Sequence, residues 1–318
     1  MKKWSFLILI LAATGFSSCG DSDQPTPVVD DYKLLSVTTS GKILEIGNNT
    51  GATVNIGQIT NQSNLIQLAT ICNVGSKIYC LEASYVPSPN ILTVYDKATK
   101  TTTTQQLILP PSIAATMTDP FITNLEYNGS EFIAVVSENM PNNMRPNKII
   151  SINPVNYQTT DLNIDFFQRT LTSTELINDK LYIATRTEGL LKIDLTQKTV
   201  TELQANGARI NATRLAKNGT TKLSLMKLGV PQVINGVQPY EYDLSNNTLT
   251  DKSQGAIFAV GNITGGTLVK NGEYINYVFN ATNGFGILKV NTVTNEQKFV
   301  ALDQNAVGSN CIIIDTLP

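Results

Sequence analysis

The side chains available for chemistry are limited, because the chain contains no histidine. This excludes Ser-His-Asp triads, Cys-His dyads, imidazole zinc sites and histidine haem ligation. An enzyme built from this chain would depend on carboxylates, tyrosines, lysines or a metal ion held by oxygen. Glu126, Glu138, Asp119 and Asp165 could supply the carboxylate pair that glycoside hydrolysis requires, but their sequence spacing does not pair them.

Arginines are the second candidate group. The chain has five of them, and they do not cluster in sequence: Arg145, Arg169, Arg186, Arg209 and Arg214. The last four come from adjacent repeats, so some of them could line a central funnel and attract a carboxylate or a phosphate. The alternative is that each pairs with a neighbouring acid such as Glu175 or Glu188, and we favour this for any single arginine.

Two Pro-containing segments carry further candidates for ligand contact. Tyr85, in YVPSPN, could be a stacking platform for a sugar or part of a packed lid. Arg145 follows Met140 and Met144 in ENMPNNMRPN, which could contact a partner or be a tolerated insertion whose methionines pack on the domain. Both segments are expected in loops, where binding residues on a rigid scaffold usually lie.

The four cysteines are assigned separately. Cys72 and Cys80 flank the turn 73–77, so an oxidising compartment would permit a cross-strand disulfide. The alternative is two buried thiols that act as small apolar side chains. Cys311 has no assigned partner, and Cys19 directly follows the predicted N-terminal signal.

The N-terminus predicts export. Lys2 and Lys3 precede an apolar stretch over 4–16, which is shorter than the roughly 18–20 residues of a membrane-spanning helix. This arrangement is typical of a secretory signal peptide. The segment ends in Gly-Phe-Ser-Ser-Cys, which resembles a bacterial lipobox with Cys19 as the lipidated residue. The acidic stretch that follows resembles lipoproteins of Bacteroidetes.

These features divide the chain into three parts. We expect a signal peptide over 1–18, a lipidated cysteine with a flexible tether over 19–31, and one domain over 32–318. The predicted location is the cell envelope, as an outer-membrane lipoprotein that faces the periplasm or the surface.

Internal repeats dominate the domain. The clearest unit, 174–203, contains four strand-like pieces separated by turn residues. Four other stretches repeat this order: 65–107, 123–162, 213–250 and 266–302. The N-terminal stretch of the domain lacks the first strand of a unit, and the segment 309–315 supplies only one strand. Together these two segments would complete a sixth unit. We therefore predict an all-β, six-bladed propeller, with seven blades as the alternative, whose C-terminal strand closes the ring on the N-terminal blade.

The repeats resemble those of YVTN/quinoprotein-type (YncE-like) propellers, whose third strand carries an Asp followed by a turn. Asp96, Asp194 and Asp243 match that Asp, and Asn153 and Asn291 replace it in two units. The resemblance covers most of the chain and implies a fold, because propellers carry many unrelated activities. The simplest role for these residues is to bond nearby backbone amides in the turn.

Charge and loop lengths bear on function. Only 15% of residues are charged and the formal net charge is −2, which argues against nucleic acid as a partner. The long loops of the predicted propeller share one face, and this is the expected ligand face. We expect a non-catalytic module that binds a glycan or a protein, with no cofactor and no metal. The alternatives are a carboxylate-based hydrolase or lyase, and a structural subunit of an envelope complex, which predicts a large apolar patch.

Overall fold

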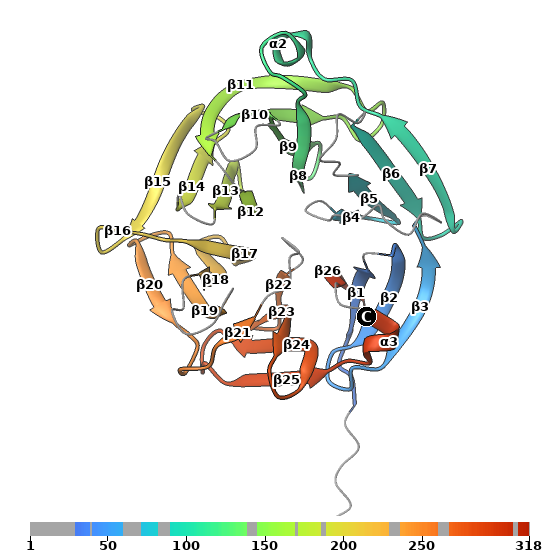
Figure 1. The fold of residues 1–318 in the computed structure, drawn as a ribbon, viewed down its shortest axis with the longest axis vertical. Coiled ribbons are helices and arrows are strands. Elements are labelled where there is room, and N and C mark those ends of the chain that lie inside the picture. The colour runs from blue at the N-terminus through green and yellow to red at the C-terminus, as the bar shows by residue number, and fades with distance from the viewer. Residues whose placement is uncertain are drawn as a thin grey trace, which may run out of the picture.

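The computed structural model describes residues 29–38, 40–59, 71–81, 90–138, 145–168, 171–185, 189–228, 236–259, 267–307 and 311–317. These residues form antiparallel sheets around a centre (Figure 1). No helix within these ranges is long and apolar enough to cross a membrane.

Three of the sheets have four strands each, and in each sheet the strands follow one another from the centre outward. The first contains β26 (Cys311–Leu317), β1 (Lys33–Thr38), β2 (Lys42–Gly47) and β3 (Thr53–Gln58). The second contains β4 (Ile71–Val74), β5 (Lys77–Leu81), β6 (Ile91–Asp96) and β7 (Thr101–Gln106). The third contains β8 (Phe121–Tyr127), β9 (Phe132–Ser137), β10 (Arg145–Ile152) and β11 (Thr159–Gln168).

The other two sheets are larger. A five-stranded sheet contains β12 (Leu171–Ile177), β13 (Lys180–Thr185), β14 (Leu190–Asp194), β15 (Thr199–Ala205) and β16 (Ala208–Arg209). A nine-stranded sheet begins with β17 (Ala212–Asn218), β18 (Lys222–Leu228), β19 (Gly236–Asp243), β20 (Thr248–Asp251) and β21 (Phe258–Ala259). It continues with β22 (Thr267–Lys270), β23 (Glu273–Asn280), β24 (Gly284–Asn291) and β25 (Gln297–Ala301). Two short helices, α2 (Pro111–Ala114) and α3 (Gln304–Val307), lie outside the sheets.

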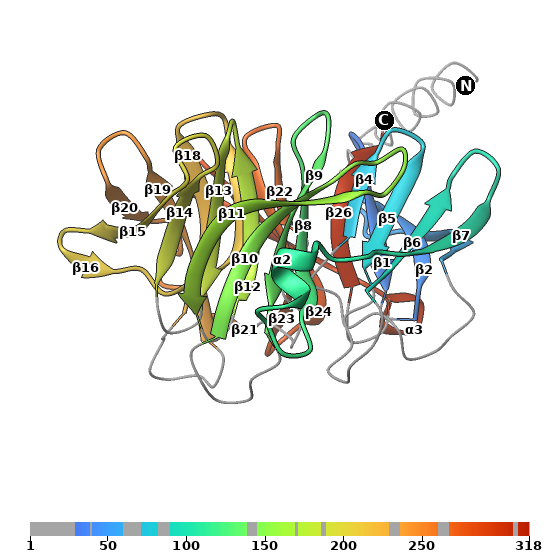
Figure 2. The same cartoon turned by 90° about the horizontal axis from the view of Figure 1, so that it is seen from above.

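The innermost strands lie around the centre (Figure 1). β4 contacts β8, β8 contacts β12, β12 contacts β17, β17 contacts β22 and β22 contacts β26. The prediction of an all-β propeller is thus confirmed as a propeller-like ring of small sheets. Seen from the side, the short turns that follow the innermost strands lie on the upper side of the ring (Figure 2).

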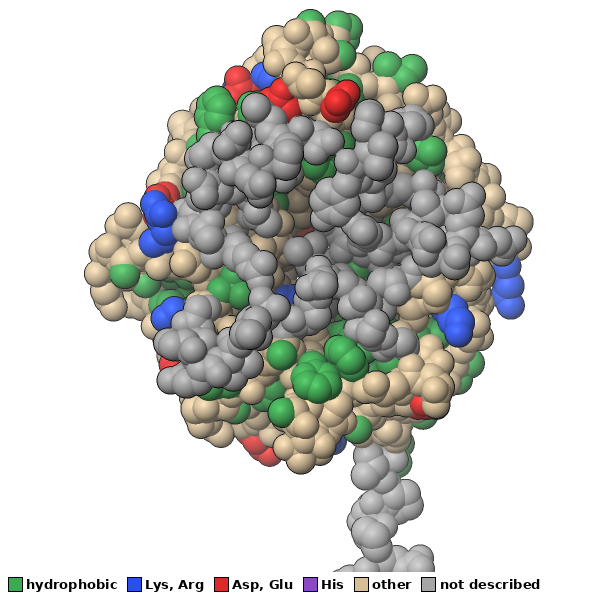
Figure 3. All heavy atoms as spheres, viewed as in Figure 1, with side chains coloured by type: hydrophobic (Ala, Val, Ile, Leu, Met, Phe, Trp, Pro, Cys, Tyr) green, Lys and Arg blue, Asp and Glu red, His purple; other side chains and the backbone are tan. Residues whose placement is uncertain are grey.

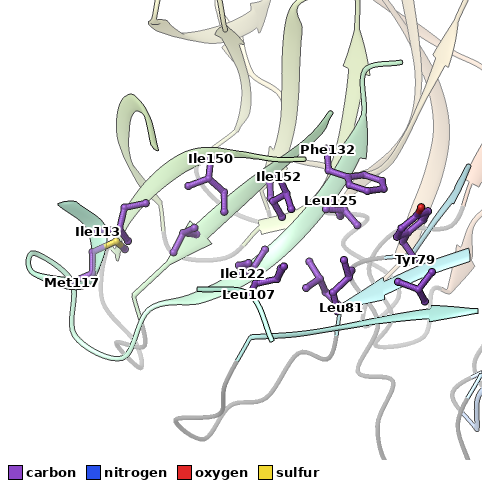
Figure 4. Packing of buried hydrophobic residues seen from close by; sticks show 14 residues of the cluster. Tyr79, Leu81, Leu107, Ile113, Met117, Ile122, Leu125, Phe132, Ile150 and Ile152 are labelled. Carbon is purple, nitrogen blue, oxygen red and sulfur yellow. The ribbon is translucent and has the colours of Figure 1, made fainter. Parts of the chain in front are cut away.

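Apolar side chains hold neighbouring sheets together. In one cluster, Tyr79 and Leu81 of the β4–β7 sheet pack against Leu125, Phe132 and other buried residues of the β8–β11 sheet (Figure 4). The same kind of core recurs between the other neighbouring sheets, and one further cluster lies between the two ends of the nine-stranded sheet. The strand pattern explains this arrangement, because alternate side chains of each strand face the sheet on either side.

The predicted turn role of the repeated Asp and Asn residues is confirmed. The Asp96 carboxylate accepts the amide N–H groups of Ala98 and Thr99, at 2.8 and 3.2 Å. Asp194, Asp243, Asn153 and Asn291 accept the corresponding N–H groups in their own turns. Each of these five residues therefore stands at or directly after the end of the third strand of its own unit and starts the turn.

Candidate functional site at the centre of the ring

Two glutamates approach each other at the centre. Glu126 is the penultimate residue of β8, and Glu175 lies near the end of β12, the next innermost strand. The Thr174 hydroxyl donates a hydrogen bond of 2.6 Å to Glu126 Oε1, across the boundary between the two sheets. Burial raises the pKa of the Glu126 carboxyl above its usual value.

Glu175 is held by backbone amides. Its Oε1 accepts the N–H of Leu176 at 3.1 Å, and its Oε2 accepts the N–H of Lys217 at 3.0 Å. Burial, followed by the charge of Glu126, raises the pKa of Glu175 to about 8. The Lys217 ammonium lies 3.8 Å from Oε1 and opposes this rise only in part. The pair therefore keeps a proton at neutral pH, while the Glu175 side chain remains 14% exposed.

Side chains from β4 and β26 also lie at this end of the centre, near the glutamate pair. Burial and then the Glu126 charge raise the pKa of the Cys72 thiol to about 12, so this thiol is a poor nucleophile. Asp315 accepts a hydrogen bond of 2.5 Å from Asn73, and the Lys97 ammonium donates to the other amide atom of Asn73 at 2.7 Å. Both acidic and basic groups thus lie around this end of the centre, which suits a polar or charged ligand.

The glutamate pair lies on the side of the ring opposite to the predicted ligand face. Glu126 and Lys217 each stand one residue before the end of an innermost strand, and Glu175 stands two before it. Short turns follow these strands, whereas the long loops leave from the other end. On the face seen in Figure 3, most of the described charged side chains lie near the rim.

Of the predicted arginines within the described ranges, Arg214 lies on an innermost strand, β17. Its side chain is buried, and the Nη1 group donates to the carbonyl oxygen of Tyr277 at 3.2 Å. The Tyr274 hydroxyl donates to the carbonyl oxygen of Arg214. The Arg214 backbone has a φ of 57° at an irregularity in the pairing of β17 with β18, an uncommon conformation for a side chain of this size. Burial lowers the pKa of its guanidinium to about 10.

Arg209 does not lie at the centre of the ring. It lies on β16 at the outer edge of its sheet, and its Nε donates to Glu202 at 2.8 Å. This is the pairing with a neighbouring acid that we favoured for single arginines. Arg145 begins β10. The other predicted contact residues lie outside the described ranges: Tyr85, Arg169 and Arg186. The predicted lipidation residue, Cys19, also lies outside them.

Cys72 and Cys80 do not form the disulfide. Cys72 pairs with Tyr79 and Cys80 pairs with Ile71, so the two thiols point to opposite faces of the hairpin. Cys72 packs in one core cluster, beside Tyr79, and Cys80 packs in another. The alternative of two separate thiols therefore describes this hairpin.

Only one of the four carboxylates singled out in the sequence joins the site. Glu138 is buried and accepts the N–H of Thr118 at 2.6 Å, Asp165 pairs with Lys148 at the surface, and Asp119 is exposed. The partner of Glu126 is Glu175, which the sequence suggested only as a partner for an arginine. A usable signal existed, because both glutamates lie near the end of the first strand in consecutive repeats. No group of three or more acidic or cysteine side chains that could hold a metal ion lies within the described part of the chain.

Comparison with known proteins finds structures with a similar fold. No protein-family description matches the sequence, and no curated protein matches it. The crystal structure of a puromycin hydrolase superposes with a TM-score of 0.52 at 12% identity, covering 87% of this chain and 47% of that one. A second structure, a puromycin hydrolase S511A mutant complexed with PGG, gives a TM-score of 0.47 at 9% identity, covering 86% of this chain and 52% of that one. The chain thus spans about half of those proteins, and the first likeness concerns the fold alone.

Proposed function

We propose that this protein is an exported, lipid-anchored, six-bladed propeller that binds a glycan, without catalysis, at the glutamate-lined end of its centre. The observation that carries the ligand site is the Glu126–Glu175 pair. A pair that holds one proton can both donate and accept hydrogen bonds, as recognition of sugar hydroxyl groups requires. The amides and the hydroxyl that hold both carboxylates keep the pair in place before a ligand arrives.

Two features support six blades in a closed ring. β21 is a two-residue strand that links β19 to β23, and without it the nine-stranded sheet divides into two four-stranded units. The C-terminal strand β26 pairs with β1 and also contacts β4. Both ends of the domain would then share one blade, as the complementary partial repeats at the chain ends predict.

The proposed export and lipid anchor rest on the sequence of the first nineteen residues. Metabolic labelling with a palmitate analogue tests them, with Cys19→Ala as the comparison. Label in the native protein and none in the variant is the expected result. Label that persists in the variant would contradict a Cys19 anchor, whatever the outcome for ligand binding.

Glycan-array binding of residues 20–318, followed by thermal shift with each hit, tests the ligand site. Glu126→Gln and Glu175→Gln should each weaken binding of a hit at least about tenfold, which removes about 1.4 kcal/mol of binding free energy. Glu296→Gln, an exposed glutamate on another part of the ring, is the matched control and should bind as the native protein does. If no glycan binds, the ligand class is wrong, and a protein partner from the envelope becomes the better proposal.

A carboxylate-based hydrolase or lyase is the second candidate function. One observation favours it: a carboxyl group with a pKa of about 8 is suited to general acid catalysis near neutral pH. The same glycan hits decide between the two functions. Glycan that stays intact after prolonged incubation with the native protein supports binding alone. Glycan fragments that form with the native protein but not with Glu175→Gln support the hydrolase.

A further inference from the structure

The outer edge of the β4–β7 sheet is open. β7 (Thr101–Gln106, TTTTQQ) is the last strand of this sheet and lies at the perimeter of the ring (Figure 1). All of its residues are exposed and none is charged. Its pairing with β6 has no irregularity from one end to the other. An uncharged edge strand without a bulge offers its free backbone groups to any further strand that reaches it.

The other outer strands each carry a feature that hinders such pairing. The pairing of β3 with β2 and that of β11 with β10 contain an irregularity. β15 pairs over part of its length with β16, β20 ends in Asp251, and β25 contains Lys298. β7 therefore differs from every other outer strand among the described residues.

The hydrogen bonds next to β7 show which of its backbone groups point outward. The N–H of Leu107, one residue after the strand, donates to the carbonyl oxygen of Asn90 at 2.7 Å, on the β6 side. Because the direction of these groups alternates along an antiparallel strand, every second residue of β7 points its N–H and C=O away from β6. These residues are Thr102, Thr104 and Gln106.

We propose that β7 pairs, antiparallel and centred on Thr104, with β7 of a second copy of this chain. The register follows from the outward residues, since a shift by one residue would set outward groups of one copy against inward groups of the other. Centring on Thr104 uses every outward residue of both copies and forms about six backbone hydrogen bonds, one for each outward N–H. The contact is the same surface on both copies, so it closes as a dimer.

The side chains of β7 complement those of a second β7, which favours a copy of this chain as the occupant. In the proposed register Thr102 faces Gln106, Thr103 faces Gln105, and Thr104 faces its own equivalent. Hydroxyl and amide groups can hydrogen-bond across each of these pairs, and no like charges meet. The Gln105 amide, which donates to the outward carbonyl oxygen of Gln106 at 2.9 Å, exchanges this exposed bond for the second strand.

Sedimentation velocity of residues 20–318 at about 5–500 µM protein tests the proposal. The protein should change from monomer to dimer with a dissociation constant of about 10–200 µM, because pairing of one edge strand buries less area than a standard interface. The glutamate pair lies at the centre of the ring, away from β7. The dimer therefore leaves that site open, and neither result depends on glycan binding.

Two substitutions at Thr104 should weaken the dimer at least about tenfold. Thr104→Lys places like charges opposite each other at the centre of the pairing. Thr104→Pro removes the outward N–H and leaves the bonds between β6 and β7 in place, because that N–H points away from β6. Thr250→Lys, the same charge change at an exposed position of the outer strand β20, is the matched control and should dimerise as the native protein does. Thermal melting of each variant shows that it is folded.

Disulfide cross-linking tests the register. In the proposed pairing the two Thr104 positions face each other with about 5.5 Å between their Cα atoms, a distance that a disulfide spans. The two Thr102 positions lie about 13 Å apart along the strands. Mild oxidation should therefore cross-link Thr104→Cys into a dimer, whereas Thr102→Cys, which carries the same number of thiols, should remain uncross-linked.

Three results would overturn the proposal. A native protein that stays monomeric at every concentration would exclude a second copy as the occupant, and an extended segment of another protein would become the better one. A dimer that Thr104→Lys and Thr104→Pro leave unchanged would place the contact elsewhere. Cross-linking of Thr102→Cys as readily as Thr104→Cys would exclude the register.

Discussion

The stability of this protein should fall as pH rises, and Glu175 is the main cause. The folded state holds the Glu175 proton up to about pH 8, whereas an unfolded chain releases it near pH 4.5. Between these values the folded state binds more protons than the unfolded chain. The free energy of unfolding therefore decreases with rising pH across this window and levels off above it.

The magnitude follows from the same two values. At 1.36 kcal/mol for each pH unit, the difference corresponds to about 5 kcal/mol at and above pH 8, and about 3 kcal/mol at pH 7. These figures are upper bounds, because the side chain is 14% exposed and water and Lys217 can move toward the charge. We expect a measured loss of at least about 2 kcal/mol between pH 5.5 and pH 8.5.

Glu175→Gln should remove most of this dependence. The amide cannot ionise, so the variant should be more stable than the native protein at pH 8.5 and close to it at pH 5.5. Urea unfolding at several pH values measures the difference. Glu296→Gln serves as the control and should keep the native slope.

Two outcomes would refute this reasoning. A native protein that is equally stable at pH 5.5 and pH 8.5 would mean that Glu175 is not desolvated in the folded state. A variant with the native slope would assign the pH dependence to other groups. In either case, the conclusion that the glutamate pair shares a proton at neutral pH would be wrong.

Three further predictions follow from single contacts. Asp30→Ala removes three hydrogen bonds to Asn49 and Thr50, at 2.8, 2.9 and 2.7 Å. The variant should have a lower melting temperature, because it loses about 1–2 kcal/mol of stability. An unchanged melting curve would show that these bonds do not stabilise the segment before β1. Cys72 should resist iodoacetamide until the protein unfolds, because burial raises the pKa of its thiol to about 12, and labelling in native buffer, read by mass spectrometry, would contradict this. Arg214→Ala should cost about 3 kcal/mol or more in urea unfolding, since it leaves a cavity and removes the bond to Tyr277; a loss below about 1 kcal/mol would mean that water reaches the Arg214 side chain in solution.

Local residue patterns account for much of the fold. Alternating apolar residues and turn residues in each repeat were enough to predict small antiparallel sheets, and Asp96 with its counterparts marked the turns. These features depend on neighbours in sequence, which is why they were visible there. The sequence also predicts the Cys72–Cys80 hairpin, but not its register. A shift of one residue in the register decides which face of the hairpin each thiol lies on.

Sequence by itself therefore determined the class of fold, the absence of imidazole chemistry and the role of the repeated turn residues. Only the tertiary structure decided which polar residues meet. Thr174 and Glu126 are 48 residues apart in the chain, yet neighbouring innermost strands bring them into contact and place Glu175 beside them. Arg209 and Arg214 are close in sequence but lie at the edge and near the centre of the ring. The physical reason is that the distance between side chains of different sheets depends on how the sheets pack, and burial, which sets their pKa values, exists only after that packing.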